Sequence, residues 1–100
     1  MGVEIFSKET LENYREYLSK ITSNPVYLII DTELRNYPSN EKLEIISKTP
    51  IQLEEYRDSI KQLALNPVCS IIDLVLTGAG LTPYEKLKLV NQALKEKYNS

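Results

Sequence analysis

The sequence contains no histidine and no tryptophan, and it has only one cysteine and three glycines in 100 residues. Histidine is the usual proton carrier near neutral pH and the commonest ligand of transition metals in proteins, so its absence excludes Ser-His-Asp, Cys-His and HExxH sites. The single Cys69 excludes an internal disulfide and any CxxC motif. We therefore expect no catalytic residue, no metal ion and no cofactor.

The chain also lacks an excess of charge of either sign. Twelve basic and fourteen acidic residues give a net charge of -2, which does not attract nucleic acid or anionic lipid. No apolar run approaches the roughly 20 residues that span a bilayer, and the first residues carry no signal-peptide pattern. A lone cysteine is typical of a reducing compartment. We expect a cytoplasmic protein without membrane contact.

The most informative feature is an internal repeat. Residues 11–34 align with residues 53–76 at an offset of 42 positions, and eleven of these 24 positions are identical. After a two-residue insertion, Glu41-Lys42-Leu43 matches Glu85-Lys86-Leu87. Repeats of 20–50 residues usually correspond to helical units. The sequence predicts a single domain of two pseudo-symmetric repeats, approximately 7–48 and 49–95.

Each repeat is predicted to contain three helices. The first helix has possible N-caps at Ser7 and Thr49, and Thr49-Pro50-Ile51-Gln52 has the composition of a capping box. A second capping box, residues 82–85, predicts the start of the third helix in the second repeat, and Ser39 the start in the first. Apolar residues then follow helical spacing in the first helix of each repeat: Leu11, Tyr14, Leu18 and Ile21, and Leu53, Tyr56, Ile60 and Leu63.

The second segment of each repeat, 25–36 and 67–77, is ambiguous. Asn24-Pro25 and Asn66-Pro67 are good helix starts. However, VYLIID and VCSIID are short β-branched runs that could also form buried parallel strands. The aspartate in each run favours a helix. An all-α fold of about six short helices is therefore predicted, with a small α/β domain as the alternative.

Two aspartates lie within these apolar segments, and burying an aspartate requires a partner. The basic residues that we expect to pair with Asp31 and Asp73 are Arg15 and Arg57, which are also repeated. The alternative is that the two carboxylates converge as an acid/base couple or a metal site. Two nearby guanidinium groups make structural ion pairs the better interpretation.

The two copies differ most at the end of the second helix. Thr32, Glu33 and Arg35 correspond to Leu74, Val75 and Thr77, and Asn36 corresponds to Gly78, so the second copy is apolar nearly all round. Such a helix is either buried on every side or part of a dimer or partner surface. The candidate partner surface comprises Leu74, Leu81 and Tyr84.

Gly78-Ala79-Gly80 lies between the last two predicted helices. A Gly-x-Gly hairpin followed by Lys86 and Lys88 would suit a phosphate backbone, but a helix C-cap followed by a turn explains the glycines without a ligand. The resulting hypothesis is a non-enzymatic helical protein-protein interaction or regulatory module, for which a homodimer is one form of the interaction. Abundant Ile, Lys, Asn and Tyr suggest an AT-rich microbe, virus or mobile element. The alternative is a nucleic-acid-binding domain that uses the region from Gly78 to Lys88.

Overall fold

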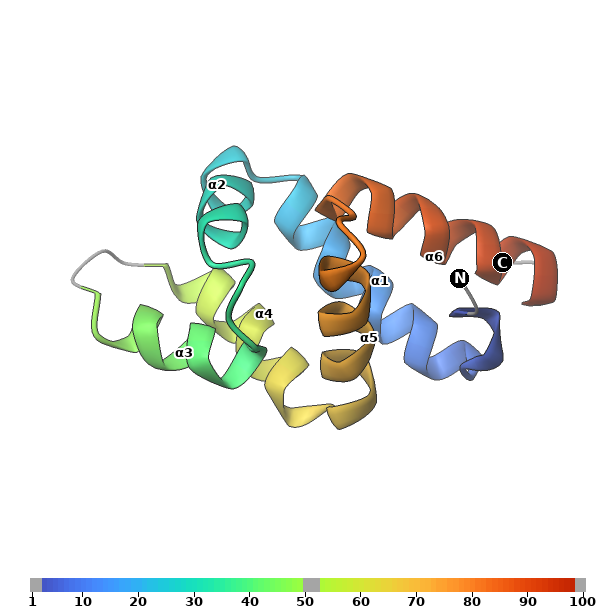
Figure 1. Ribbon diagram of the computed structural model, residues 1–100, viewed down its shortest axis with the longest axis horizontal. Coiled ribbons are helices and arrows are strands. Elements are labelled where there is room, and N and C mark those ends of the chain that lie inside the picture. The colour runs from blue at the N-terminus through green and yellow to red at the C-terminus, as the bar shows by residue number, and fades with distance from the viewer. Residues whose placement is uncertain (1–2, 50–52, 99–100) are drawn as a thin grey trace.

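The fold of the computed structural model, which describes residues 3–49 and 53–98, is all-α (Figure 1). No strand occurs in these residues. The elements are a short 3-10 helix and six α-helices: η1 (Val3–Ile5), α1 (Lys8–Thr22), α2 (Pro25–Glu33), α3 (Ser39–Ser47), α4 (Glu54–Leu65), α5 (Pro67–Gly78) and α6 (Pro83–Tyr98). The predicted all-α class is therefore confirmed.

The two ambiguous segments are helices, so the α/β alternative is wrong. The side chain of Asn24 accepts hydrogen bonds from the amides of Val26 and Tyr27, at 3.0 and 3.4 Å. The side chain of Asn66 accepts one from Cys69 at 3.2 Å. Each asparagine is followed by a proline in the first turn. Capping and proline together outweigh the β-branched composition of the two runs.

Helix α2 is shorter than predicted and ends at Glu33, so Arg35 and Asn36 lie in the following turn. The Arg35 amide donates to Thr32 O at 3.3 Å, and the Tyr37 amide to Leu34 O at 3.0 Å. Both bonds close turns of four residues, and Pro38 disfavours helical backbone at Tyr37, the residue before it.

The other predicted helix starts can be compared with the structure one by one. Ser7 caps α1, and its hydroxyl accepts from the Thr10 amide at 3.2 Å. Thr82 and Glu85 form the predicted capping box of α6, with reciprocal bonds of 3.0 and 3.3 Å. The start predicted at Thr49 is wrong, because α4 begins at Glu54 with Leu53 as its N-cap residue. The capping box predicted there depends on residues 50–52, which lie outside the described residues. The Thr49 hydroxyl itself donates to Ile45 O at the end of α3.

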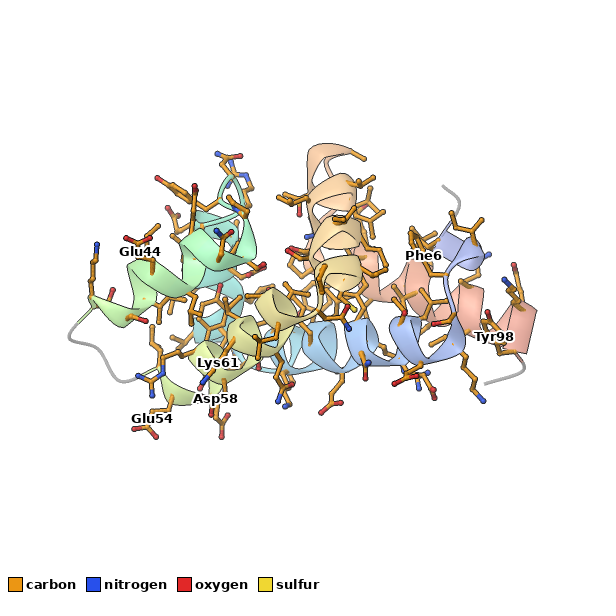
Figure 2. The ribbon with its side chains drawn as sticks, turned by 90° about the horizontal axis from the view of Figure 1, so that it is seen from below. Phe6, Glu44, Glu54, Asp58, Lys61 and Tyr98 are labelled. Atoms are coloured by element: carbon orange, nitrogen blue, oxygen red, sulfur yellow. The ribbon has the colours of Figure 1, made fainter. Side chains whose placement is uncertain are left out.

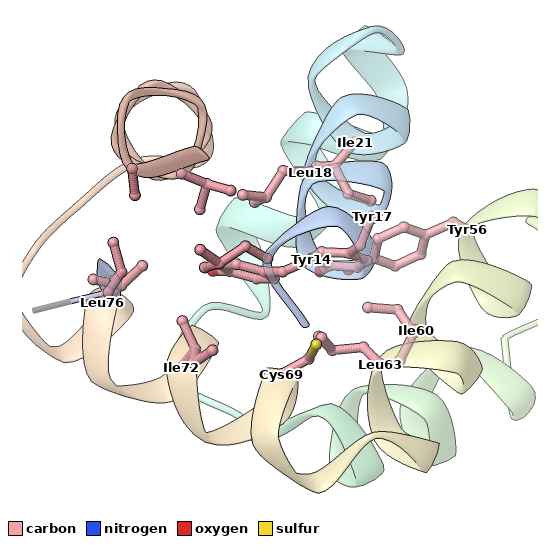
Figure 3. Close-up of a cluster of buried hydrophobic side chains, with 14 of the residues drawn as sticks. Tyr14, Tyr17, Leu18, Ile21, Tyr56, Ile60, Leu63, Cys69, Ile72 and Leu76 are labelled. Atoms are coloured by element: carbon pink, nitrogen blue, oxygen red, sulfur yellow. The ribbon is translucent and has the colours of Figure 1, made fainter. Parts of the chain in front are cut away.

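Helix α1 is the central element of the molecule, which measures 42 × 24 × 23 Å. It packs against α2, α4, α5 and α6, whereas α3 packs against α4 (Figure 1). The apolar stripes predicted for α1 and α4 are confirmed: their residues are buried, and several of them meet in the core shown in Figure 3. The stripe residues are Leu11, Tyr14, Leu18, Ile21, Leu53, Tyr56, Ile60 and Leu63.

The two ends of the described chain lie together. Phe6 and Tyr98 are neighbours at one end of the molecule (Figure 2), and the Tyr98 hydroxyl donates to Phe6 O at 2.9 Å. Helix α6 also packs against η1. The last helix therefore closes the fold against its first residues.

Helix α5 is buried on one side only, so the expectation that it is buried on every side is wrong. Cys69, Ile72 and Leu76 are buried, but Ile71 and Val75 are 59% and 58% exposed. Helices α1 and α4 pack against α5, and no other described helix covers the side of α5 that carries Ile71 and Val75.

Among the described residues, no single helix has both the length and the apolar composition needed to cross a membrane. Helices α4 and α5 meet the criteria only as a pair, and they are bent by 105° relative to each other.

The turn between α5 and α6 follows the Schellman pattern. The Leu81 amide donates to Leu76 O at 3.1 Å and the Gly80 amide to Thr77 O at 3.0 Å. Gly80 has a φ of 87°, in the left-handed region. The glycines are thus explained by the helix end.

We predict that Gly80→Ala lowers the free energy of unfolding by about 1 kcal/mol, because a side chain at this φ is strained although the space around it is open. Gly78→Ala is the matched control. It also meets no neighbouring atom, and within a helix alanine is favoured over glycine by about 1 kcal/mol. Urea unfolding measures both variants, and equal effects would contradict the assignment of Gly80 as the strained position.

Candidate functional site: a buried cluster of aspartate, lysine and tyrosine

Six of the seven elements of the fold contribute to one buried polar cluster, to which α1 supplies two residues. We call it the charge cluster. It comprises Tyr14, Tyr17, Asp31, Lys42, Tyr56, Asp73 and Lys86, of which all are at most 6% exposed. No comparable group of ionisable side chains is expected inside an apolar core unless its members satisfy one another.

Asp31 on α2 lies at the first centre of the cluster. Lys42 on α3 donates to Asp31 Oδ1 at 3.2 Å. The hydroxyls of Tyr17 and Tyr56 donate to the same oxygen, at 2.9 and 2.8 Å. Three donors from three helices therefore hold one carboxylate oxygen, which ties α1, α3 and α4 to α2.

Asp73 on α5 lies at the second centre. Lys86 on α6 donates to Asp73 Oδ1 at 3.1 Å and to the Thr77 hydroxyl at 2.6 Å. The Tyr14 hydroxyl donates to the same carboxylate oxygen at 2.7 Å. Lys42 lies 3.9 Å from Asp73 Oδ2, so the two centres are in electrostatic contact.

The tyrosines connect the two halves of the chain. Tyr14 in the first half donates to Asp73 in the second, and Tyr56 in the second half donates to Asp31 in the first. The rings of Tyr14, Tyr17 and Tyr56 lie side by side between the helices in Figure 3, and the Tyr14 and Tyr17 rings are stacked at 6.3 Å. Each lysine, by contrast, bonds to the aspartate of its own half.

The arginine partners predicted for the aspartates are wrong. Arg15 lies 3.8 Å from Glu12 on its own helix, and Arg57 is exposed on α4. The tyrosines, and not the arginines, lie on the inner faces of α1 and α4, and their hydroxyls donate to the aspartates. Lysine replaces arginine because Lys42 and Lys86 lie on the buried face of their helices, three residues after Ser39 and Pro83 respectively.

The sequence contained a signal for these lysines. Lys42 and Lys86 match each other in the repeat, and each lies four residues before a buried apolar residue, Ile46 or Val90. A lysine that recurs on an apolar helix face next to a recurring buried aspartate indicates an ion pair.

Burial changes the acid-base chemistry of the tyrosines. Desolvation, together with the charges of Asp31 and Asp73, raises the pKa of Tyr14 and of Tyr17 well above the ordinary value of 10.0. The same causes raise the pKa of Tyr56. These phenols therefore act as hydrogen-bond donors over the whole physiological pH range.

Cys69 is a buried core residue, 2% exposed. Desolvation raises the pKa of its thiol to about 11, and the Asp73 charge acts in the same direction. The thiol therefore stays protonated at neutral pH, which is the opposite of an activated nucleophile. In the described part of the chain, no group of three or more Cys, Asp or Glu side chains is placed to hold a metal ion.

The candidate partner residues lie in two places. Leu74 is 43% exposed on α5. Leu81 and Tyr84 lie after the turn and line a cleft beside α2. The Tyr84 hydroxyl also donates to Thr22 O at 3.2 Å. The three residues do not form one continuous lining.

The region from Gly78 to Lys88 is used mainly within the fold. Gly80 completes the end of α5, and the ammonium of Lys86 lies 3.1 Å from Asp73. The Glu85 carboxylate accepts a hydrogen bond from the Thr82 amide, and this hydrogen bond lowers the pKa of the Glu85 carboxyl. Lys88 is the exposed lysine of the region, and one exposed lysine is too few to bind the phosphate backbone of a nucleic acid.

Comparison with known proteins gave no match to a family model, to a curated protein or to a solved structure. The function is therefore inferred from the residues of the chain and their arrangement.

We predict that Asp31→Asn lowers the free energy of unfolding by about 3 kcal/mol, because it removes the carboxylate to which the buried Lys42 ammonium donates its hydrogen bond. Asp73→Asn should do the same through Lys86. Asp58→Asn, on the outer face of α4 (Figure 2), is the control, with an expected change below about 0.5 kcal/mol. Urea unfolding compares the three variants. Unfolding curves that coincide with that of the parent protein would refute a stabilising role for the cluster.

Stability should also decrease at alkaline pH. The unfolded tyrosines lose their protons near their ordinary pKa of 10.0, whereas the folded ones retain them. The contribution of the three tyrosines is therefore complete below pH 10 and is lost as the pH rises above it, with a slope of about 4 kcal/mol per pH unit. Tyr17→Phe should reduce that slope by about a third, and Tyr37→Phe, at an exposed position, should not. A free energy of unfolding that stays constant above pH 10 would contradict the assignment.

Proposed function

We propose that the protein is a non-enzymatic helical interaction module that binds another protein through the outer face of α5, and that a second copy of the chain is its partner. The observation that supports this proposal is an apolar face that no described element covers. Ile5, Ile71 and Val75 are 76%, 59% and 58% exposed. Large apolar side chains that are exposed and contiguous are typical of interaction sites.

These residues are contiguous because they surround one groove. The groove has a volume of about 240 Å³ and lies between η1 and α5. All of its lining residues are apolar: Val3, Ile5, Phe6, Ile71, Ile72, Val75 and Leu76. Burying such a surface is favourable by about 25 cal/mol per Å² before the costs of association.

A second copy fits this surface for two reasons. Projecting side chains such as Ile5 and Val75 border a recess, so one face carries both a ridge and a hollow. A two-fold axis places the ridge of each copy against the hollow of the other. The lining carries no charged side chain, so two identical faces meet without like-charge repulsion.

We also propose that the chain consists of two repeats of one helical unit. Lys42 and Lys86 bond to equivalent aspartates, and Tyr14 and Tyr56 make equivalent bonds across the two halves. Helix α1 packs against α6, just as α4 packs against α3. The lone, buried Cys69 supports a reducing compartment such as the cytoplasm.

The experiment that tests the interaction uses a pair of equivalent positions. Ile71→Lys on α5 is expected to convert a dimer into a monomer, because it places an ammonium group in the apolar contact. Ile29→Lys is the matched control at the equivalent place on α2, where the side chain is 64% exposed. Light scattering after size-exclusion chromatography measures the mass of each variant.

The expected result is a dimeric parent, a dimeric Ile29→Lys variant and a monomeric Ile71→Lys variant. A parent that is monomeric at high micromolar concentration would overturn self-association. Circular dichroism confirms that each variant remains folded, so that loss of the dimer is not loss of the fold.

A further inference from the structure

A second cavity, distinct from the apolar groove, reaches the charge cluster. It is a cleft of about 420 Å³ between the C-terminal end of α2 and the turn that joins α5 to α6. Asp31, Lys42 and Lys86 are among its lining residues, with Arg35 at the surface. The cleft has no residue in common with the groove beside η1.

Most of the charged side chains that line the cleft are positive. Lys42, Lys86 and Arg35 are basic, and Asp31 is the one acidic residue of the lining. Asp73 lies behind it and pairs with Lys86. Even with Asp73 included, one positive charge remains in excess, although the whole chain has a net charge of -2. A concentration of opposite charge in a partly enclosed cleft favours an anion.

The lysines retain hydrogen-bonding capacity. An ammonium group has three donors. Lys42 uses one on Asp31, since Asp73 Oδ2 at 3.9 Å lies beyond hydrogen-bond distance. Lys86 uses two, on Asp73 and Thr77. Arg35 has five donors, and its guanidinium donates at 2.9 Å to Thr32 O.

The N-terminus of α6 adds a backbone donor to the same cleft. Thr82, Pro83 and Tyr84 all line it. Pro83 has no amide hydrogen, and the amides of Glu85 and Lys86 donate to Thr82. Within the described chain this leaves the Tyr84 amide as the unused donor of the first turn. The helix dipole places partial positive charge at this end of the 16-residue helix.

The other walls are partly apolar and partly formed by uncharged polar residues such as Thr32 and Asn36. Leu28, Leu81 and the ring of Tyr84 border the cleft, and the Tyr84 hydroxyl is held by Thr22 O. A volume of 420 Å³ is within the range of small-molecule sites, which are mostly apolar with a few polar groups that fix orientation.

We propose that this cleft binds a small organic anion: a carboxylate or phosphate ester with a short apolar body. The anionic group lies between Arg35, the two lysines and the Tyr84 amide, and the apolar body lies against Leu28 and Leu81. Asp31 keeps Lys42 in place. The ligand therefore contacts α2, α3 and α6, and its binding stabilises the junction between the two halves.

The test uses hexanoate and phenyl phosphate as probes and the neutral hexanamide as comparator. Isothermal titration calorimetry measures affinity, and amide chemical shifts locate the site. Replacing either lysine would disturb the core, so the variant is Arg35→Gln at the exposed rim. Arg57→Gln, an exposed arginine on α4, is the matched control.

We expect at least one anionic probe to bind and to shift the Tyr84 and Leu81 amides. Arg35→Gln should weaken that binding about tenfold, which corresponds to the loss of one charge-assisted hydrogen bond. Arg57→Gln should leave it unchanged. Failure of both anions to bind at millimolar concentration, equal binding of hexanamide, or an unchanged affinity in Arg35→Gln would each overturn the proposal. The dimer test at Ile71 is independent of all these outcomes.

Discussion

Two aspartates and two lysines are buried inside the small hydrophobic core of this 100-residue chain. Removing such charges from water costs several kcal/mol per ion, and the cost is recovered only where the geometry satisfies every group. Here each carboxylate accepts from one lysine and at least one tyrosine. No fully buried side-chain nitrogen or oxygen among the described residues lacks a partner. The positions of α2, α3, α5 and α6 around α1 and α4 depend on this mutual satisfaction, because a displaced helix would leave a buried charge unpaired.

The helices themselves follow from local signals in the sequence. The Asn-Pro pairs predict the starts of α2 and α5, and the repeated stripes predict the inner faces of α1 and α4. The ion-pair partners could not be predicted with the same reliability, since an arginine and a lysine at helical spacing are equally plausible until the rotation of each helix is known. The recurrence of Lys42 as Lys86 in the repeat marks these lysines as candidate partners, but it does not show that Lys42 is buried. Its burial depends on the tertiary position of α3 against α4.

The exposed side of α5 shows a different limit of sequence patterns. A helix that is apolar all round predicts burial, but the pattern does not state whether the same chain or another one covers each face. In this fold Cys69 and Ile72 face inward and Ile71 faces outward. The tertiary arrangement of the described helices decides which face of α5 is covered, and that arrangement is a global property of the fold. Leu74, Leu81 and Tyr84, which the sequence grouped together, are separated by the Schellman turn at Gly80.

The exchange of tyrosines between the halves has a consequence for how the protein folds. Residues 3–48 contain Asp31 but not its donor Tyr56, and residues 53–98 contain Asp73 but not its donor Tyr14. Neither half contains all the hydrogen-bond donors that its buried aspartate requires. Both halves must therefore assemble in the same step, as one cooperative unit. Under the repeat proposed above, a single unit would meet the same requirement only by associating with a second copy of itself. Joining two such units in one chain makes that association independent of concentration.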